Sequence, residues 1–395
     1  MHQNSLNFPL MYNNINKKDI YKLIQFLKKN PRLTAGEKCL EFENAWSKWL
    51  GVKYSVFVNS GSSANFLTLA ALKIFRGKDK RNQIITPTLA WNSDVVSVIY
   101  NNFEPIFVDI NLKNLSMSLE QIKKKISKNT LAIFLPHIQG FNAINNELLT
   151  LVKKKNIYLI EDVCESHGAK FKNKKCGTFG LASNFSFYYA HHMTTIEGGM
   201  ISTNNKKFFD LCKMMKGHGL VRESTFKSTR NFYQNKYKDL NEEFIFSNYG
   251  FNFRNNEIGA VLGINQLKRL NKNIKLRNRN FNFFLKNLNS NLYFTDFNTK
   301  GCSNYAFPVI LLNKNISYRN KFENYLTNNK IEFRRGNAGG GNQLRQPYLD
   351  HYKIHKLSEF TNVDFVHFFG YYIGNYPELS IDKLRKLINK LNNFK

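Results

Sequence analysis

Short apolar runs alternate with helix-forming segments between residues 54 and 160. Segments 63–75 and 145–155 are two of the helical stretches that separate the runs. This alternation predicts an α/β fold, with a mainly parallel central sheet flanked by helices and with ligands at the carboxyl ends of the strands. The runs that we predict as buried strands are Tyr54–Val58, Gln83–Thr86, Pro105–Val108, Leu131–Leu135 and Ile157–Ile160.

The remainder of the chain predicts an arm and a second domain. Residues 1–20 are polar and are expected to form an N-terminal arm, followed by a large α/β domain over residues 21–264. Residues 265–395 are expected to begin with a long connecting helix, to residue 287, and to continue as a smaller C-terminal α+β domain. The elements predicted in that domain are strands at 305–311 and 331–334 and a final helix at 381–391.

Composition limits the setting in which such a chain works. With 395 residues, 42% of them hydrophobic, the chain can bury a substantial core. No apolar stretch is long enough for a membrane span, and the first residues lack the basic and apolar regions of a secretion signal. The five cysteines include no CxxC or CxC pair, so we expect no disulfide framework, no metal site and a reducing, cytoplasmic location.

The formal net charge is +30, from 58 Lys and Arg against 28 Asp and Glu. Such a charge raises nucleic acid or an anionic membrane as partners. The lysines are scattered among many Asn, Ile and Phe residues rather than clustered, which favours a general composition bias over binding of a polyanion. A nucleic-acid binder remains an alternative and would lose affinity steeply with salt.

Three features follow predicted strands and carry groups that can bind a ligand. Small residues in Asn59–Asn65 at the start of a helix can form a phosphate cradle, or only a tightly packed turn. Asp162 can pair with a protonated ring nitrogen, or cap a helix or form a buried ion pair. Trp91 offers a flat face for stacking, or is simply part of the core.

Together with further motifs, these features resemble the sugar-aminotransferase family of fold-type I pyridoxal-phosphate (PLP) enzymes, from about residue 34 to the carboxyl terminus. The resemblance implies that fold, with a small C-terminal α+β domain. The motifs that carry it are Asn59–Ala64, Glu161-Asp162, Ser166–Ala169, Gly177–Gly180, Phe185–Phe187, Glu197–Gly199 and Tyr249–Arg254.

The resemblance implies a role for each matching position. Gly61, Ser62 and Ser186 would hold the cofactor phosphate, Trp91 would stack on its ring, and Asp162 would pair with the ring nitrogen. Asn252 would reach the phosphate of a neighbouring subunit, which implies a homodimer with shared active sites. The positions expected to touch substrate are His218, Arg222, Arg254 and Arg334.

One position departs from the family pattern and directs the prediction of function. The family's catalytic lysine lies five residues after the phosphate serine, where this chain has His191, followed by His192. Imidazole cannot hold the cofactor by the covalent bond that an amine forms, but it can move a proton near neutral pH. We therefore expect His191 to be a base, with PLP or its amine form, pyridoxamine phosphate (PMP), bound without a covalent bond to lysine.

The same His–His pair occurs in the family's sugar 3-dehydratases. That resemblance implies removal of the C3 hydroxyl from a nucleotide-linked 4-keto-6-deoxyhexose, GDP-4-keto-6-deoxy-D-mannose of the colitose pathway, with L-glutamate as amino donor. One branch of these enzymes needs an iron–sulfur cluster held partly by a CxC pair, which this chain lacks. The alternatives are a nucleotide-sugar 4-aminotransferase and a catalytically silent homologue that binds a nucleotide sugar.

A glycine-rich segment at 336–342 is a short insertion relative to that branch. We expect it to touch the sugar or the nucleotide. The alternative is a flexible turn of no chemical consequence.

Overall fold

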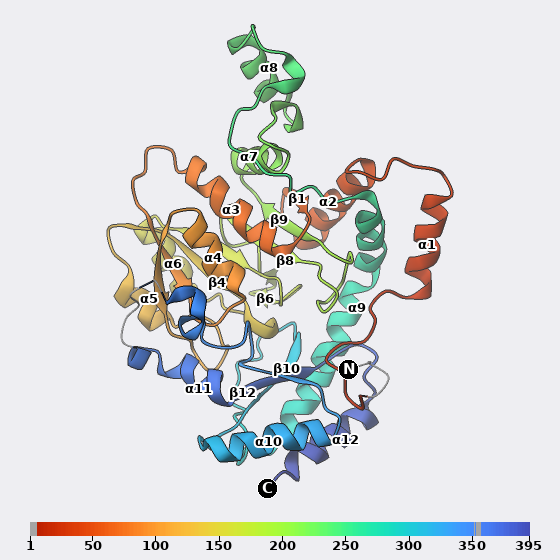
Figure 1. Cartoon of the computed structure of the whole chain (residues 1–395), viewed down its shortest axis with the longest axis vertical. Helices are drawn as coiled ribbons and strands as arrows, with labels where there is room; N and C mark the ends of the chain where they lie inside the picture. Colours follow the sequence, from red (N-terminus) through yellow and green to blue (C-terminus); the bar gives the residue numbers. More distant parts are fainter. Residues whose placement is uncertain (1–5, 351, 353–356) are drawn as a thin grey trace.

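A seven-stranded sheet forms the centre of the larger part of the molecule (Figure 1). The computed structural model describes residues 6–350, 352 and 357–395. Strand β9 is antiparallel to both of its neighbours, β1 and β8, whereas the remaining neighbours are parallel. In spatial order the strands are β1 (Tyr54–Val58), β9 (Gly199–Thr203), β8 (Ala182–Ser186), β5 (Tyr158–Asp162), β4 (Thr130–Pro136), β2 (Gln83–Pro87) and β3 (Glu104–Val108).

The two faces of this sheet carry separate cores because alternate residues of a strand point to opposite sides. Val56 and Val58 pack with residues of α3, α4 and α7, whereas Phe57 between them packs with α2 and α9. The helices α5 and α6 cover the second face farther along the sheet. The predicted fold class is confirmed, and these helices are α2 (Glu37–Leu50), α3 (Gly61–Phe75), α4 (Asn92–Tyr100), α5 (Leu119–Lys125), α6 (Asn146–Lys155) and α7 (Lys206–Lys216).

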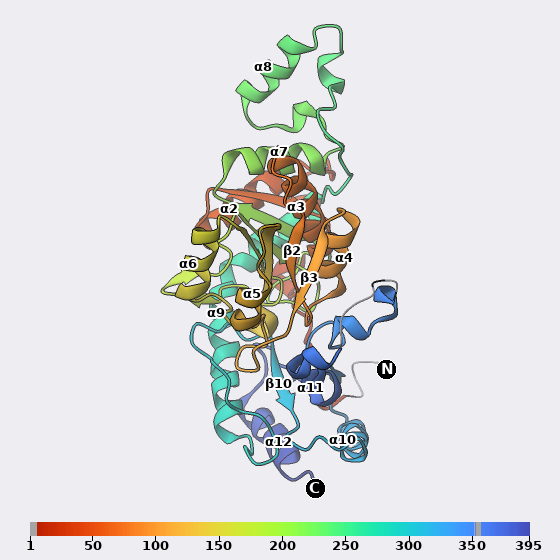
Figure 2. The same cartoon turned by 90° about the vertical axis from the view of Figure 1, so that its left-hand side faces the viewer.

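The smaller part contains a three-stranded antiparallel sheet in the order β10-β12-β11. Helix α9 (Glu257–Asn287) runs from the large sheet to this smaller one (Figures 1 and 2). The other elements are β10 (Ala306–Ile310), β11 (Phe333–Arg335), β12 (Gly370–Gly374), α10 (Ile316–Asn328), α11 (Thr361–Phe369) and α12 (Ile381–Asn392), with 3-10 turns at Gln343–Arg345, Pro347–Leu349 and Leu357–Glu359.

Helix α9 begins eight residues before the predicted start at 265. Asn256 caps it by accepting a hydrogen bond from the Gly259 backbone N–H at 2.9 Å. Gly263 lies against the ring of Phe42, where a Cβ atom would come within 2.6 Å of the ring. Gly263 therefore serves close packing between α9 and α2, and Gly259 lies beside Thr195 in the first turn of α9.

Residues 17–20 of the N-terminal arm predicted over residues 1–20 belong to a helix. Helix α1 (Lys17–Leu27) starts at a capping box formed by Asn16 and Asp19. Asp19 also accepts hydrogen bonds from Arg269 and Asn265 of α9, at 2.5 and 2.6 Å. A carboxylate thus fixes α1 to the body, and residues 1–5 of the predicted arm lie outside the described residues.

Residues 220–250 extend away from the sheet and are called the projection below (Figures 1 and 2). They contain α8 (Lys227–Lys236) and 3-10 turns at Val221–Glu223 and Glu242–Phe244, and α8 buries none of its residues. None of the helices in the described ranges combines the length and the apolar character needed to cross a bilayer. Two short elements complete the structure, the hairpin of β6 (Lys170–Phe171) and β7 (Lys174–Lys175), and the 3-10 turn Ile138–Gly140.

Candidate active site

The carboxyl ends of β1 and β8 meet the start of β9 at one edge of the sheet. Gly199 pairs with Val58 on one side and with Ser186 on the other. A Cβ atom on Gly199 would lie 2.2 Å from the Ser60 carbonyl oxygen, so only glycine allows the turn after β1 to cross there. The register therefore brings the start of α3 against the end of β8.

Gly61 and Ser186 form the floor of this junction. A Cβ atom on Gly61 would come within 2.6 Å of the Ser186 Cβ, and Ser60 caps α3 by accepting from the Ser63 backbone N–H at 3.0 Å. The first N–H groups of a helix have no partner inside it and attract an anion. Ser62 is exposed beside them, so the N-terminus of α3 and the Ser186 hydroxyl offer a set of donors suited to a phosphate.

Asp162 ends β5 at the same edge and is almost fully buried. It accepts hydrogen bonds from the Cys164 backbone N–H and from the Asn65 side chain, both at 2.8 Å. The same Asn65 amide donates to Asp94 of α4 at 2.6 Å. Burial, and next the Asp162 charge, raises the pKa of Asp94 well above its usual value, so Asp94 is held neutral while Asp162 faces the site.

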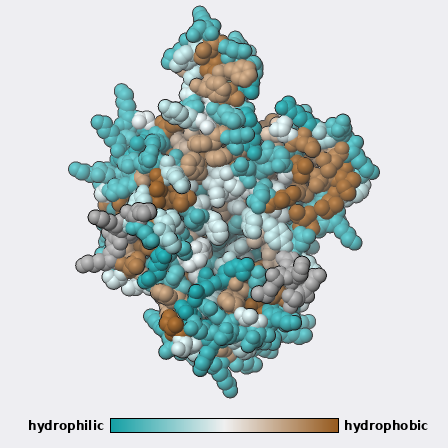
Figure 3. All heavy atoms as spheres, in the orientation of Figure 1, coloured by the Kyte–Doolittle hydropathy of each residue, from teal (hydrophilic) through white to brown (hydrophobic). Residues whose placement is uncertain are grey.

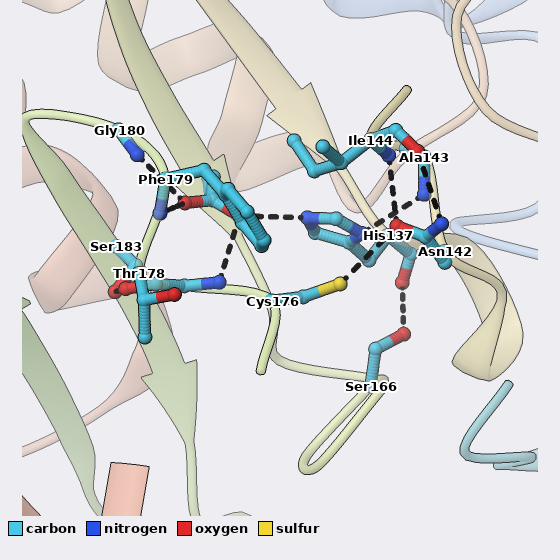
Figure 4. Close-up of polar contacts among 12 residues, drawn as sticks. His137, Asn142, Ala143, Ile144, Ser166, Cys176, Thr178, Phe179, Gly180 and Ser183 are labelled. Atoms are coloured by element: carbon cyan, nitrogen blue, oxygen red, sulfur yellow. Dashed lines mark hydrogen bonds and ion pairs between the residues drawn. The ribbon is translucent and has the colours of Figure 1, made fainter. Parts of the chain in front are cut away.

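A network of buried polar groups supports the end of β5 (Figure 4). Glu161 accepts hydrogen bonds from the backbone N–H groups of Gly177, Phe179 and Gly180, at 2.7 to 2.9 Å. His137 accepts from the Ala143 N–H through Nδ1, so its ring proton lies on Nε2, 3.3 Å from Glu161. These hydrogen bonds hold Glu161 in place, and they therefore also fix the position of Asp162, the next residue in the chain.

His191 lies in the loop between β8 and β9. Its backbone N–H donates to the Tyr188 carbonyl at 3.0 Å, and Phe187 and Gly198 close the base of the loop with a 2.8 Å bond. The Asn14 side chain contacts the carbonyls of His191 and His192 at 3.4 Å. The loop is thus held at its base and from the N-terminal segment, and it presents His191 toward the sheet edge.

The environment of His191 keeps its imidazole neutral. Burial lowers its pKa to about 4, while the Asp162 charge opposes this shift and Arg277 adds to it. The His191 Nδ1 atom is buried and makes no hydrogen bond within the described part of the chain. At neutral pH the ring can therefore accept a proton.

Two further histidines are packed beside it. His192 is buried and its Nε2 lies 3.1 Å from the Ser303 carbonyl oxygen. His167 is buried between the rings of Phe185 and Phe187, which lie nearly parallel to it with centroids at 5.7 Å. His192 is therefore anchored through Nε2, although its Nδ1, like that of His191, has no hydrogen-bond partner among the described residues.

Trp91 is largely exposed, with 62% of its surface accessible, directly before α4. The glycine-rich loop packs against the turn that carries it: a Cβ atom on Gly339 would lie 1.9 Å from the Ala90 carbonyl oxygen. The Gln343 N–H also donates to the Thr88 carbonyl at 2.9 Å. The loop is therefore an ordered neighbour of Trp91 rather than a turn without contacts.

Among the described contacts, none joins the remaining predicted residues to His191, and the Arg254 backbone pairs with Val58 at the end of β1. His218 and Asn252 are exposed at the base of the projection. Arg222 pairs with Glu243 at 3.3 Å and Arg254 pairs with Glu223 at 2.8 Å. These four residues therefore do not join the cluster around Asp162 within a single chain, and their roles stay predictions.

Arg334 lies on β11 of the small sheet and pairs in register with Tyr372. The Tyr372 ring lies 6.3 Å from Tyr305, which in turn lies 5.5 Å from His191, measured between ring centroids. Arg334 is thus linked to His191 only through Tyr372 and Tyr305 among the described contacts. Its own side chain pairs with Glu332.

The chain is similar to known proteins over nearly its whole length. Residues 13–392 match the DegT/DnrJ/EryC1/StrS aminotransferase family. The chain belongs to this family. It is 31% identical over 394 residues to the GDP-4-keto-6-deoxy-D-mannose 3-dehydratase of Escherichia coli O55:H7, which covers 97% of this chain and 100% of the relative.

Another member of the family is similar at nearly the same level. The GDP-perosamine synthase of Escherichia coli O157:H7 is 29% identical and covers 91% of this chain and 90% of the relative. Among solved structures, GDP-4-keto-6-deoxymannose-3-dehydratase with a trapped PLP–glutamate geminal diamine has a TM-score of 0.87 and 28% identity, covering 97% of this chain and all of that one. The family and the fold are thus secure, and they admit both reactions.

The structure also adds residues that the sequence motifs did not single out. Asn65 and Asp94 bind each other beside Asp162, and Asn65 lies one helical turn after Gly61, a spacing that could have indicated a shared face. Burial raises the pKa of Glu165 to about 7, and Gln139 donates its N–H to it at 2.8 Å. Neither Gln139 nor Glu165 was assigned a role from the sequence. Within the described ranges no cluster of His, Cys, Asp or Glu can hold a metal ion.

The buried histidines predict a pH dependence of stability. Burial lowers the pKa of His167 well below 6.5, so as the pH falls under 6.5 the unfolded chain binds a proton that the folded chain does not. Below pH 6.5, the free energy of unfolding should therefore fall less steeply with falling pH in His167→Phe than in the wild type. The difference in slope should be about 1.4 kcal/mol per pH unit, measured by urea unfolding. An equal slope in the His167→Phe and wild-type chains would contradict the prediction.

Proposed function

We propose that the protein is a PLP-dependent 3-dehydratase that acts on a nucleotide-linked 4-keto-6-deoxyhexose, with GDP-4-keto-6-deoxy-D-mannose as its substrate. The observation that carries this proposal is His191, a neutral imidazole that follows the Ser186 cradle by five residues and feels the Asp162 charge. An amine at that position would bind the cofactor covalently and return a proton to the sugar. An imidazole can only transfer the proton.

The residues of the site fit the cofactor. The N-terminus of α3 and the Ser62 and Ser186 donors suit its phosphate. Asp162, fixed by Asn65 and Cys164, suits a protonated ring nitrogen, and the exposed face of Trp91 suits its ring. When bound, the cofactor supplies an electron sink and carries the amino group taken from the donor.

His191 and Asp162 divide the proton transfers of this reaction. Asp162 holds a proton at the ring nitrogen by its negative charge. The His191 imidazole accepts one proton at a ring nitrogen and gives it to the C3 hydroxyl of the sugar, which leaves as water. In the proposed reaction His191 gives its proton to the leaving hydroxyl and not to sugar C4, so the nitrogen is lost as ammonia.

The overall reaction balances with L-glutamate as the amino donor. Glutamate is oxidised to 2-oxoglutarate and ammonia, and the sugar is reduced by loss of the C3 oxygen. The 3-dehydratase relative names this class of sugar, and the solved relative that holds a PLP–glutamate adduct supports glutamate as the donor.

The proposal is tested by incubating the protein with PLP, L-glutamate and GDP-4-keto-6-deoxymannose, followed by mass spectrometry and ammonium assay. A sugar lighter by one oxygen atom, with ammonium released, supports the dehydratase. A 4-amino sugar would overturn it in favour of the aminotransferase. A protein that binds the nucleotide sugar but forms no 2-oxoglutarate would be the silent homologue.

His191→Asn should reduce dehydration by a factor of about 100 or more, because it removes the general base while keeping a polar side chain of similar size. Binding of PLP, followed by its absorbance in a dialysis titration, should remain close to that of the wild type. The wild-type chain, assayed in parallel, is the control. Full dehydration by His191→Asn would exclude it as the base.

The proposed enzyme is a homodimer with shared active sites. The projection exposes Tyr249, Phe244 and Phe246, with 91% of the Tyr249 surface accessible. Helix α1 turns the side chains of Ile20 and Ile24 outward, where Figure 3 shows an apolar patch. Exposed apolar patches of this kind mark interfaces. In the proposed dimer, Asn252 reaches the phosphate cradle of its partner.

Subunit mixing tests the shared site. Chains with His191→Asn and chains with Asn252→Ala should each be nearly inactive, because each breaks both sites of a homodimer. After unfolding and refolding together, mixed dimers should regain activity, since one site then receives an intact His191 and an intact Asn252. Refolded samples of each variant alone are the controls. If mixing restores nothing, each site is built from one chain.

A further inference from the structure

Asp94 of α4 and Asp162 of β5 are two buried acids bridged by one neutral amide. The Asn65 amide nitrogen donates to Asp94 Oδ1 at 2.6 Å and to Asp162 Oδ2 at 2.8 Å. The two acids are 2% and 8% exposed, and neither forms an ion pair within residues 6–350, 352 and 357–395. Two carboxylates this close, buried and without a cation, repel each other strongly, so one of them has to hold a proton.

The hydrogen bonds decide which acid holds it. Asp162 accepts from the Cys164 backbone N–H through Oδ1 and from Asn65 through Oδ2, and such donors favour the ionised form. Asp94 accepts only from Asn65 among the donors of the described residues. A hydrogen bond also joins the Asp94 and Asp162 carboxyl groups, and two ionised carboxylates could not form it because both only accept. Asp94 is therefore the neutral acid that donates to Asp162.

The other titratable groups that face this pair carry no permanent positive charge. They are Glu165 and Cys164 after β5, Tyr348 in the 3-10 turn that contains it, and His191 in the loop between β8 and β9. Burial shifts the pKa of each of them toward its uncharged form. In the described surroundings of the pair, nothing therefore compensates a second negative charge.

We propose that Asp94 is a positioning residue that, as a neutral acid, donates a hydrogen bond to Asp162 and so keeps the cofactor proton on the ring nitrogen. A carboxylate that receives this bond is stabilised in its ionised form and has a lower affinity for a proton. The proton between Asp162 and the ring then stays on the nitrogen, where it makes the ring an electron sink. The inference rests on the proposed function, because Asp162 is proposed there as the partner of that nitrogen.

The first test detects the proton on Asp94 in the chain without cofactor. Infrared spectroscopy distinguishes the carbonyl stretch of a protonated carboxyl group from the bands of carboxylates. Asp94→Asn imitates the neutral acid, since its amide can accept from Asn65 and donate to Asp162, and it should fold like the wild type. At neutral pH the wild type should show one protonated carboxyl group more than Asp94→Asn, while Glu165 contributes equally to both. Identical carboxyl bands in the two chains would overturn the proposal.

The second test follows the cofactor proton by NMR of PLP that is enriched in 15N at its ring nitrogen and bound to the full chain. Asp94→Asn keeps the donor and should give the wild-type shift of a protonated ring. Asp94→Leu has a similar size but no donor, and its signal should move toward that of an unprotonated ring. Equal shifts in the Asn and Leu variants would overturn the proposal. If Asp94→Leu does not fold, the infrared comparison of the wild type with Asp94→Asn still decides.

These measurements separate the role of Asp94 from the proposed reaction. A ring signal that responds to Asp94→Leu in a protein that forms no dehydrated sugar would contradict the 3-dehydratase and leave the role of Asp94 intact. An unprotonated ring in the wild type would overturn the role of Asp94, whatever the activity.

Discussion

The close crossing of the Ser60–Gly61 turn over the junction of β8 and β9 is the constraint on which the site depends. Gly199 leaves no room for a side chain against the Ser60 carbonyl, and Gly61 leaves none against Ser186. This contact sets the start of α3 beside the end of β8. It also fixes where the following loop begins, and therefore where His191 lies.

The second constraint is the placement of charge around a histidine. A negative group is needed at the end of β5, and Asn65 and the Cys164 N–H hold Asp162 there while Asp94 is kept neutral. The same negative charge would protonate a nearby imidazole. Burial acts against this, so one site can contain both an anion and a neutral base. In a lysine-containing site the base is an amine that also binds the cofactor, and this balance is not needed.

Much of the large sheet could be predicted from sequence because β1 to β5 are nearly continuous apolar runs. Strand β8 was not predicted, because its Ser183 and Asn184 look unfavourable for a core strand. The structure gives each a buried partner: Ser183 donates to the Gly177 carbonyl and the Asn184 side-chain oxygen accepts from Thr68, at 2.7 Å each. Strand β9, beside it, was missed as well. Such tertiary hydrogen bonds leave no local pattern in the sequence.

The site was predictable to a similar degree. Gly61, Asp162, Ser186 and His191 could be named because each sits in a short motif after a strand, and the family resemblance placed them in order. Asp94 could not, since Asn65, which joins it to Asp162, lies 29 residues from the one and 97 from the other along the chain. The three side chains meet only once α3, α4 and the end of β5 are packed together.

The central claim is that an imidazole in place of an amine directs the reaction to loss of the C3 oxygen. Running the reaction in D2O and locating deuterium in the product by NMR tests it most directly. The account predicts one deuterium at C3 of a sugar that has lost its C3 oxygen. The sugar leaves the site with its amino group still attached, and C3 then takes a proton from the solvent before ammonia is released. Deuterium at C4 of an amino sugar that keeps its C3 hydroxyl would contradict it.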